Sequence, residues 1–511
     1  MMNLTSSIAT NQGSSPTSVG LRLSPTGLGL VGLVVLACLY WFQHALGYWE
    51  DDSFIHLEYA RSVFEGQGFV FNGVLSNGDT APLWVLLLAA ARHLVPDWLL
   101  AGKALAALGT VFALLMQFAY CRRLQADLGS DAQDQPAWVL ALFVLNPYFV
   151  YWAYSGMEAL AASGLLMLLC LLVTRPTATP LSFLGSAFLL GLSPLVRPEM
   201  VLLIGICGPF LLWQWWKLVE GKTGPQRMAW FLGAAVLLAL PLACWTLYAL
   251  DAFGYVMPNT NAAKRAPPGT SAAWRMLMVY GMGFPGVMLS LAALAVLALR
   301  KRAVGALPRH TSLPMAAWPL LAYVVVTSLF YMVNHTYVQT RYVMVVAPGL
   351  SVLCYVMLRH LGGRTLHAVV LGVAAAAALF ITVQQAHPLV RNKAEKVEQI
   401  ERMSAYINAN LPADAKIAVY AIGQFGYLVR NELVDVGGIT QPEAAQYLWA
   451  PPEQMLAWAK RQGATYYLEG GAPEPGAELV HEIDASSIGW SMAPGYYDRK
   501  GKLRLWKLAP P

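Results

Sequence analysis

Charged residues are scarce in this chain of 511 residues. Asp, Glu, Lys and Arg make up 12% of the sequence, about half of what a soluble domain carries, whereas hydrophobic residues make up 57%. A chain with so little charge cannot cover a folded domain with a solvated surface, so the composition indicates a membrane protein. The ten-residue alternation of apolar and polar residues that is typical of transmembrane barrel strands is also missing, which favours membrane-spanning helices.

Cysteine is rare as well, and its placement excludes a disulfide framework. No cysteine occurs in the polar C-terminal part of the chain, and no pair has the spacing of metal ligands. Buried thiols are therefore the expected state. All six lie in or beside apolar runs: Cys38, Cys121, Cys170, Cys207, Cys244 and Cys354.

Apolar runs of roughly 17 to 25 residues can each cross a hydrocarbon core of about 30 Å as a helix. We predict eleven spans, and a run at 81–95 that is too short is assigned to a re-entrant or interfacial helix. The spans are 27–46, 98–118, 137–153, 159–174, 181–194, 200–216, 229–249, 275–299, 314–333, 343–358 and 365–384.

Basic residues in the short loops set the orientation, because such loops stay in the cytoplasm. Residues 1–26 are predicted to be a disordered cytoplasmic tail, followed by a transmembrane domain at 27–385 whose first outer loop is 47–97. The formal net charge of +6 could suggest nucleic acid, but its location in these loops favours the lipid bilayer as partner.

The composition changes abruptly after Gln385, where a polar segment begins. Helix 392–411, strands 416–422 and 432–437, helix 442–462 and strand 465–470 are predicted in turn, followed by further short strands. This α/β alternation predicts a separate domain at 386–511. With eleven spans the domain lies in the periplasm of a bacterial cytoplasmic membrane protein.

Three consecutive carboxylates, ending in Asp51 and Asp52, follow the first apolar run directly. The stretch "DDSFIHLEYARSVFEG" has helical spacing of apolar residues, so it predicts an amphipathic helix at the outer membrane surface. The simplest interpretation is that the two aspartates cap this helix and favour its dipole. Charges among long apolar spans are costly, however, and usually functional.

An ordered series of motifs resembles the GT-C superfamily of glycosyltransferases that use lipid-linked sugars. The likeness is strongest to the arabinofuranosyltransferases of the mycobacterial and corynebacterial cell envelope and their Gram-negative relatives, and it covers essentially the whole chain. The motifs are "DDSFIHLEYARSVFEGQGFVFN", "DTAPLW", "NPYFVYWAYSGMEAL", "LSPLVRPEM", "FGYVMPNTNAAK", "RYVMVVAP" and "AIGQFGYLVRNELVDVGGI".

The resemblance implies a multi-pass helical enzyme that passes a sugar from a polyprenyl-phosphate donor to a glycan, lipid or protein acceptor at the outer membrane face. Such chemistry needs a carboxylate near the anomeric carbon. Asp51 matches the essential first-loop aspartate of the family best, with Asp52 beside it. The carboxylate can act as a base or, if configuration is retained, as a nucleophile, and the sequence leaves both open.

The phosphate leaving group calls for cations. Arg197, Lys264 and Arg341 are the outside-facing candidates, although basic residues at such places also anchor lipid headgroups. Substrate-binding candidates, some of which could instead pair with these cations or form turns, are Glu158, Glu199, Asp79 and Asn259.

His56 lies four residues after Asp52, so both side chains could face one divalent metal ion on a helix. An interfacial histidine is the simpler interpretation of the spacing, and no cofactor is established by the sequence. Two other functions remain open: a transporter or flippase of lipid-linked sugars, and a noncatalytic envelope assembly protein. A transporter should show charges in the middle of its spans and internal repeats, neither of which is evident.

Overall fold

The computed structural model describes residues 23–130, 132–260, 264–266, 269–303, 313–420, 422–469, 473–484 and 501–509. Most of the expected cytoplasmic tail lies outside these ranges. Helix α1 (Pro25–His44) begins where the expected tail ends, because the Ser24 side chain accepts a hydrogen bond from the Gly27 N–H and Pro25 takes the first helical position.

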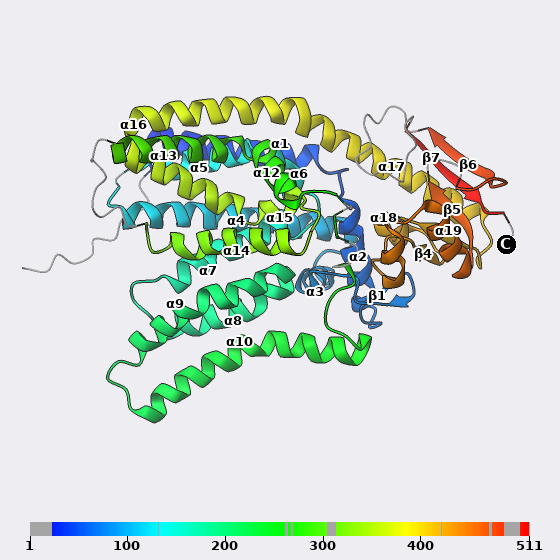
Figure 1. The fold of residues 1–511 in the computed structure, drawn as a ribbon, viewed down its shortest axis with the longest axis horizontal. Helices are drawn as coiled ribbons and strands as arrows, with labels where there is room; N and C mark the ends of the chain where they lie inside the picture. The colour runs from blue at the N-terminus through cyan, green and yellow to red at the C-terminus, as the bar shows by residue number, and fades with distance from the viewer. Residues whose placement is uncertain are drawn as a thin grey trace, which may run out of the picture.

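The described chain is mostly helical, and apolar helices form a long bundle at one end of the molecule (Figure 1). After α1 the bundle contains α4 (Trp98–Asp127), α5 (Gln135–Val144), α6 (Pro147–Ala153), α7 (Ala159–Val173), α8 (Pro180–Val196), η1 (Pro198–Val201), α9 (Leu202–Leu218), α10 (Gly224–Phe253), α12 (Ala272–Gly283), α13 (Pro285–Ala303), α14 (Ala317–Val333), α15 (Thr340–Met344) and α16 (Ala347–Ile381).

Within the described ranges, five helical stretches are long and apolar enough to cross a membrane, or up to seven if two bent pairs each count as one span. The pair α5 and α6 bends by 74° before Pro147, and α12 and α13 bend by 99° before Pro285. Proline lacks the backbone N–H that would continue each helix. Helices α7, α8 and α14 are shorter apolar helices, so the structure confirms several apolar helices without fixing their number of crossings.

Most of two adjacent expected runs, 343–358 and 365–384, lies in α16, although the first begins in α15 and the second ends in η2. Gly363 has φ 75° and ψ −176° inside this helix, so the two arms meet at a sharp kink there. A residue with a side chain would be strained in that conformation. The run 81–95 forms α3 (Pro82–Ala91), whose ten residues are too few to cross the membrane.

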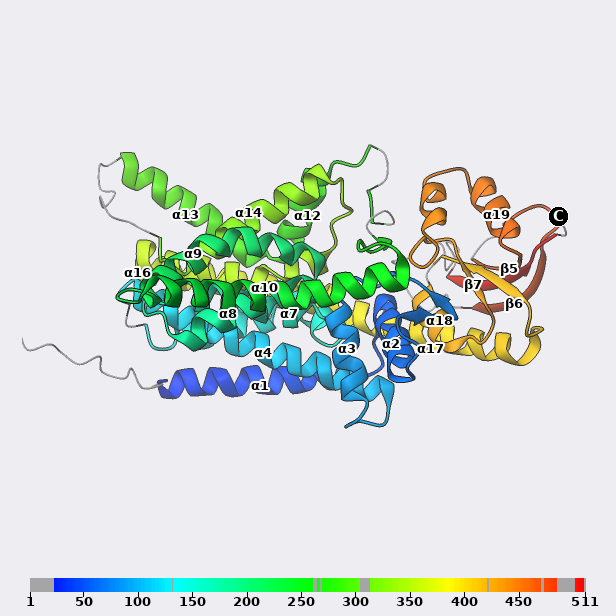
Figure 2. The same cartoon turned by 90° about the horizontal axis from the view of Figure 1, so that it is seen from below.

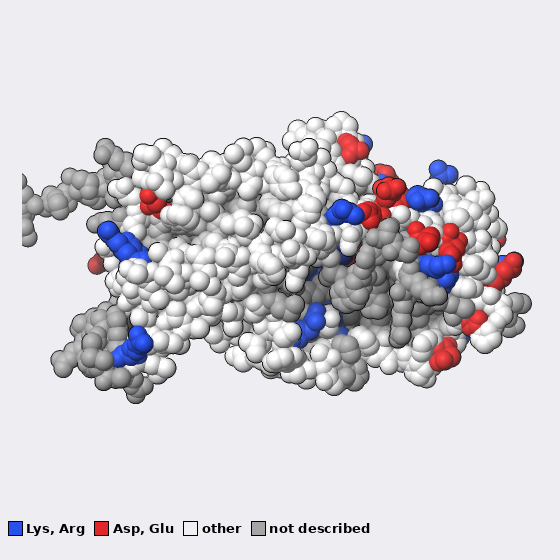
Figure 3. Space-filling view, turned by 90° about the horizontal axis from the view of Figure 1, so that it is seen from above, with Lys and Arg blue, Asp and Glu red and all other residues white. Residues whose placement is uncertain are grey.

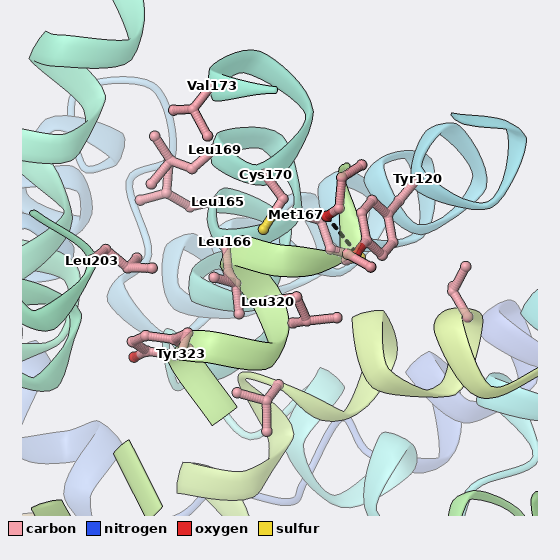
Figure 4. Packing of buried hydrophobic residues seen from close by; sticks show 14 of the residues in the cluster. Tyr120, Leu165, Leu166, Met167, Leu169, Cys170, Val173, Leu203, Leu320 and Tyr323 are labelled. Atoms are coloured by element: carbon pink, nitrogen blue, oxygen red, sulfur yellow. Dashed lines mark hydrogen bonds between the residues drawn. The ribbon is translucent and has the colours of Figure 1, made fainter. Parts of the chain in front are cut away.

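Tight packing of α4 against α7 makes the centre of the bundle. A Cβ added at Gly164 would lie 2.6 Å from the Phe112 ring, so the helices approach as closely as they do because this residue is glycine. Figure 4 shows Tyr120 and Leu320 turned toward the α7 side chains of this core. The Tyr120 hydroxyl donates a hydrogen bond of 2.9 Å to the Ala316 carbonyl, which satisfies the one polar atom of that ring.

The first outer loop folds into α2 (Asp51–Phe64), a hairpin of β1 (Val70–Phe71) and β2 (Val74–Leu75), and α3. Helix α2 is buried on most of its surface, which differs from the expected amphipathic helix. Phe54 and Leu57 are in the core as predicted, but Phe64 is exposed. Neighbouring chain segments cover the polar side of α2 as well, and that side holds several of the predicted site residues.

The polar C-terminal segment begins with α17 (His387–Asn410), which continues α16 through the π-helical turn η2 (Thr382–Ala386). A five-stranded sheet follows in the order β4-β3-β5-β7-β6, with β3 parallel to β4 and β5, and with β7 antiparallel to β5 and β6. Its strands are β3 (Lys416–Val419), β4 (Leu433–Asp435), β5 (Ala464–Glu469), β6 (Glu478–Asp484) and β7 (Lys502–Lys507).

Two expectations for this segment are corrected. The expected helix 442–462 is broken into η3 (Pro442–Tyr447) and α19 (Pro452–Arg461), because consecutive prolines at 451 and 452 cannot continue a helix. The expected strand 416–422 stops at Val419, and α18 (Ile422–Leu428) starts three residues later. The sequence analysis missed α18, whose seven residues are too few to show helical periodicity.

The sheet end of the molecule packs on the first outer loop. One hydrophobic cluster contains Phe54 and Leu57 of α2 together with Ile400 of α17, Ile417 of β3 and Phe425 of α18. Figure 2 shows α2 between the apolar bundle and the sheet. Charged side chains gather over the sheet end, with a few at the opposite tip and an almost uncharged body between (Figure 3). Helix α2 therefore lies where the apolar body meets the polar end.

Candidate functional site

Helix α2 directs its first two carboxylates to different neighbours. Asp51 and Asp52 occupy the first helical turn after Glu50, where negative charge favours the helix dipole. Neither the N-cap residue Glu50 nor its neighbours make a side-chain capping bond to this helix. Consecutive residues on a helix point about 100° apart. The two aspartates accordingly face different parts of the molecule.

The Asp51 carboxylate binds the start of α18. It accepts hydrogen bonds from the backbone N–H groups of Gly423 (3.1 Å) and Gln424 (3.0 Å). Burial raises the pKa of Asp51, although the nearby Lys396 and the two N–H groups oppose this rise. Asp51 thus holds the C-terminal segment against α2.

The Asp52 carboxylate faces a cavity and pairs with Arg341 of α15. Burial alone would raise the pKa of Asp52, but the positive charges of Arg341 and Lys264 hold it below its ordinary value. Asp52 is therefore ionised at neutral pH. About a third of its side chain remains exposed, whereas Arg341 is almost fully buried.

His56, one helical turn after Asp52, lies between two acidic side chains. Its Nδ1 is 2.6 Å from Asp79 Oδ2, and its Nε2 is 3.4 Å from Glu158 Oε2. Asp79 is fixed in turn by the Ala81 N–H, which donates to its Oδ1. Burial would lower the pKa of His56, but the two carboxylates, Asp79 above all, raise it to about 10. The imidazole is therefore charged at neutral pH.

Arg197 continues this row of alternating charges. Its Nη1 donates to Glu158 Oε1 at 2.7 Å and its Nε to Glu199 Oε1 at 2.6 Å. Burial would raise the pKa of Glu158, but the neighbouring positive charges of His56 and Arg197 hold it well below its usual range. A buried carboxylate with two cationic neighbours is compensated, so the row is stable in the interior.

Lys264 and Asn259 lie on either side of the undescribed residues 261–263. Lys264 lines the cavity, and its carbonyl accepts a hydrogen bond from the Tyr337 N–H, which ties it to the loop before α15. Asn259 is held differently. Its side chain donates to the Ile439 carbonyl (3.2 Å) and accepts from the Tyr255 hydroxyl (2.8 Å). Asn259 therefore joins loops beside the cavity and does not line it.

These elements line one cavity with about 30 Å³ of free space. Six of the predicted site residues line it, together with His56, so the structure brings most of the predicted set into one place. Asp51, Glu199 and Asn259 are not among the lining residues. Glu199 pairs with Arg197, Asn259 binds the Ile439 carbonyl, and Asp51 binds the start of α18. The predicted residues in the lining are Asp52, His56, Asp79, Glu158, Arg197, Lys264 and Arg341.

Sequence reasoning missed other residues of the cavity. Thr260 and Tyr342 line it, and Ile439 reaches it from the loop after β4. That loop is shaped by Asp435, whose carboxylate accepts backbone N–H bonds from four residues at 437–440. An aspartate followed by two glycines in "VDVGGIT" was a usable signal for such a turn.

Glu50 supports the site from behind. Its carboxylate accepts hydrogen bonds from the Tyr151 hydroxyl (2.6 Å) and from Lys393 Nζ of α17 (3.0 Å). Burial would raise the pKa of Glu50, but the charge of Lys393 holds it below its ordinary value. The beginning of α2 is thus tied to α17 by a buried ion pair.

The cavity residues do not fit a divalent ion. His56 uses Nδ1 for Asp79, and the Asp52 and Glu158 carboxylates are occupied by guanidinium groups. Within the described ranges no group of three or more His, Cys, Asp or Glu residues is arranged to hold a metal.

The chain is similar to several known proteins. A family model described as a domain of unknown function, DUF8728, matches residues 389–498. The terminal β-(1→2)-arabinofuranosyltransferase of Mycobacterium tuberculosis is 29% identical over 246 residues, which are 46% of this chain and 37% of that protein. The chain thus matches well under half the length of this curated relative.

Two solved structures are similar in fold over most of this chain. ArnT from Cupriavidus metallidurans bound to undecaprenyl phosphate aligns with a TM-score of 0.58 and 13% identity over 95% of this chain and 99% of that one. The arabinofuranosyltransferase AftD from Mycobacteria aligns with a TM-score of 0.50 and 14% identity over 96% of this chain and 40% of that one.

The chain therefore has the fold of GT-C glycosyltransferases, as its motifs predict. Its similarity to arabinofuranosyltransferases in particular is confirmed by the sequence comparison as well as by the structural one.

Proposed function

We propose that this protein is an integral membrane glycosyltransferase that transfers a sugar, arabinofuranose, from a polyprenyl-phosphate donor to an envelope glycan, lipid or protein. The observation that carries the proposal is a single cavity in which Asp52 lies beside Arg341 and Lys264. The site lies where apolar helices meet a polar end, which suits a substrate with a lipid tail and a sugar head.

Lys264 and Arg341 are assigned to the donor phosphate. When the bond between the anomeric carbon and the phosphate oxygen breaks, the electron pair stays on phosphate, and nearby cations stabilise that developing charge. Among the described residues Lys264 has no ion-pair partner, so its charge is available to a ligand. A phosphate that binds Arg341 also competes with Asp52 for the guanidinium.

Asp52 takes the catalytic role that the sequence gives first to Asp51. Its carboxylate faces the cavity, whereas that of Asp51 is bound to α18. The carboxylate can receive the proton of the acceptor hydroxyl as the new bond forms, or attack the anomeric carbon itself. Partial release from Arg341 when phosphate binds would make Asp52 more basic at the moment it is needed.

An apolar groove supports a lipid-linked donor. It has a volume of about 490 Å³ and runs along α8, α10 and the first outer loop, where its lining is almost entirely hydrophobic. Phe69, Leu192, Leu240 and Trp245 are among the residues on its walls. A polyprenyl chain can bury its surface in such a groove at about 25 cal/mol per Å².

The proposal includes the topology. Residues 27–385 form the transmembrane domain with eleven crossings, the first outer loop is 47–97, and residues 386–511 form a periplasmic domain. Basic loops such as Arg359 to His367 then face the cytoplasm, as expected for short loops.

The test is transfer by purified protein from polyprenyl-phosphoryl arabinofuranose carrying a radiolabel to membranes of a deletion strain. Labelled glycan, lipid or protein is expected with the wild type, and Lys264→Ala should raise the donor KM more than it lowers kcat. Transport of the labelled lipid across vesicles without transfer would favour a flippase. If the wild type shows neither transfer nor transport, the result favours a noncatalytic assembly role.

A further inference from the structure

Several polar atoms inside the cavity have no hydrogen-bond partner among the described residues. They are His56 Nε2, Glu158 Oε2 and Thr260 Oγ1, and each residue is less than 5% exposed. Folded proteins rarely leave buried polar atoms unpaired, because each costs its full desolvation free energy. Three such atoms around one cavity indicate a ligand that pairs with them.

The geometry of His56 and Glu158 specifies the kind of ligand group. The other nitrogen of His56 is bound to Asp79, and the other oxygen of Glu158 is bound to Arg197. Nε2 and Oε2 are 3.4 Å apart and are not in hydrogen-bond geometry. A charged imidazole offers a donor there, and an ionised carboxylate offers an acceptor. A hydroxyl can accept from one and donate to the other.

The charges around this pair disfavour a cationic group. Asp79 already faces His56, and Glu158 already faces both His56 and Arg197. An ammonium group would have to approach His56 to reach Asp79, and both His56 and Arg197 to reach Glu158. A neutral hydroxyl meets no such repulsion, so the arrangement selects hydroxylated sugars over amino sugars at this position.

From these contacts we infer that His56, Glu158 and Thr260 form a subsite that binds a hydroxyl of the donor sugar. The inference rests on the proposed function, and it places the sugar ring beside α2 while the donor phosphate lies at Lys264 and Arg341 in the same cavity. His56 thereby acts as a binding residue, held in position by Asp79.

Thr260→Val gives a sharp test because it removes one hydroxyl at almost constant volume. The hydroxyl has no partner in the described structure, so its loss should leave the melting temperature unchanged. We expect kcat/KM for polyprenyl-phosphoryl arabinofuranose to fall by about 3- to 10-fold. His56→Gln should lower it further, by about 10- to 100-fold, because a charged donor is lost. Ser163→Ala, which removes an equally buried and unpartnered hydroxyl of α7, should change neither quantity.

Monodeoxy donors identify the hydroxyl. With the wild type, one analogue among the 2-, 3- and 5-deoxy arabinofuranosyl donors should be used about 10- to 100-fold less well than the parent. With His56→Gln the same analogue should lose less than about 3-fold, because the interaction is already absent.

If the deoxy donors are used less well by the same factor in the wild type, in Thr260→Val and in His56→Gln, the proposed subsite is wrong. A penalty that appears only with deoxygenated acceptors would also overturn it, by moving the contact to the acceptor. Failure of the wild type to transfer from the parent donor would instead overturn the proposed function on which the subsite rests.

Discussion

Two adjacent aspartates at the start of α2 bind different partners. Asp51 accepts backbone hydrogen bonds from α18, and Asp52 pairs with Arg341 at the cavity. The sequence could not separate them, because both precede the same apolar pattern and neither has a distinctive neighbour. Only the partner on the other side of each carboxylate distinguishes the two, and both partners are hundreds of residues away in the chain.

Replacing each aspartate by asparagine separates the two roles. Asp52→Asn should reduce sugar transfer by about 10²- to 10⁴-fold with little change in stability, since it removes the carboxylate at the reacting carbon. Asp51→Asn should cost about 1 to 2 kcal/mol of stability, because an amide N–H would face the N–H groups of α18, and should reduce transfer by less than about 10-fold. Transfer and thermal unfolding are measured in the same detergent. If Asp51→Asn lowers transfer more than Asp52→Asn does, Asp51 is the catalytic residue.

His56 gives a prediction about pH. Its pKa of about 10 in the folded protein exceeds that of an unfolded histidine, near 6.5, so the folded state retains a proton that the unfolded state releases. The stabilisation is complete below about pH 6.5 and is lost as the pH rises toward 10.

The melting temperature of the wild type should therefore fall between pH 7 and pH 10 more steeply than that of His56→Gln, measured by scanning fluorimetry of the purified protein. Identical slopes in the two proteins would show that His56 is neutral in the folded state.

At the scale of elements, the contact of α18 with α2 connects the C-terminal segment to the site. A Cβ added at Gly423 would lie 2.0 Å from the Asp51 carbonyl oxygen, which is backbone and cannot rotate away. The Ile439 loop extends the same contact, because Ile439 lines the cavity and its carbonyl binds Asn259. The C-terminal segment therefore completes the wall of the cavity.

Gly423→Ala tests this contact. The added methyl group should push α18 away from α2, lower stability by about 1 to 3 kcal/mol and reduce transfer together with it. Gly205→Ala is the matched control, since Gly205 lies in a helix with open space around it and alanine there should stabilise by up to about 1 kcal/mol. Full transfer by a normally folded Gly423→Ala protein would show that the contact does not position the site.

The same elements show what a sequence can predict. Apolar length predicted several of the apolar helices, because that signal is local, but it did not predict the bends inside the expected spans 137–153 and 275–299. The motif residues Arg197, Lys264 and Arg341 were recognised individually, but their convergence on one cavity depends on helix packing that no local pattern contains. Ile439 and Lys393 were missed for the same reason, since each acts through a segment that is distant in sequence.

For the whole molecule, the orientation in the membrane is the central prediction. An alkaline phosphatase fused after Val390 should be active, because the polar end is expected in the periplasm, and one fused at Gly305 should be inactive. Enzyme activity is compared at matched expression levels, with a cytoplasmic reporter as the converse control. Activity of the Gly305 fusion alone would invert the topology and place the cavity on the cytoplasmic side.

The helix is uninterrupted from the kink at Gly363 through η2 to Asn410. The direction in which each of its side chains points about the helix axis therefore depends on the number of residues before it. The helix spans about 47 residues, or about 70 Å, so the direction in which Lys393 points is fixed by the count of residues before it. Adding one residue would turn the sheet by about 100° relative to the bundle and carry Lys393 away from Glu50. Adding seven would restore the direction to within about 20° but lift the sheet by about 10 Å. The length of this helix and the rotation of the sheet about its axis therefore change together. An insertion or deletion in the helix cannot alter one without altering the other.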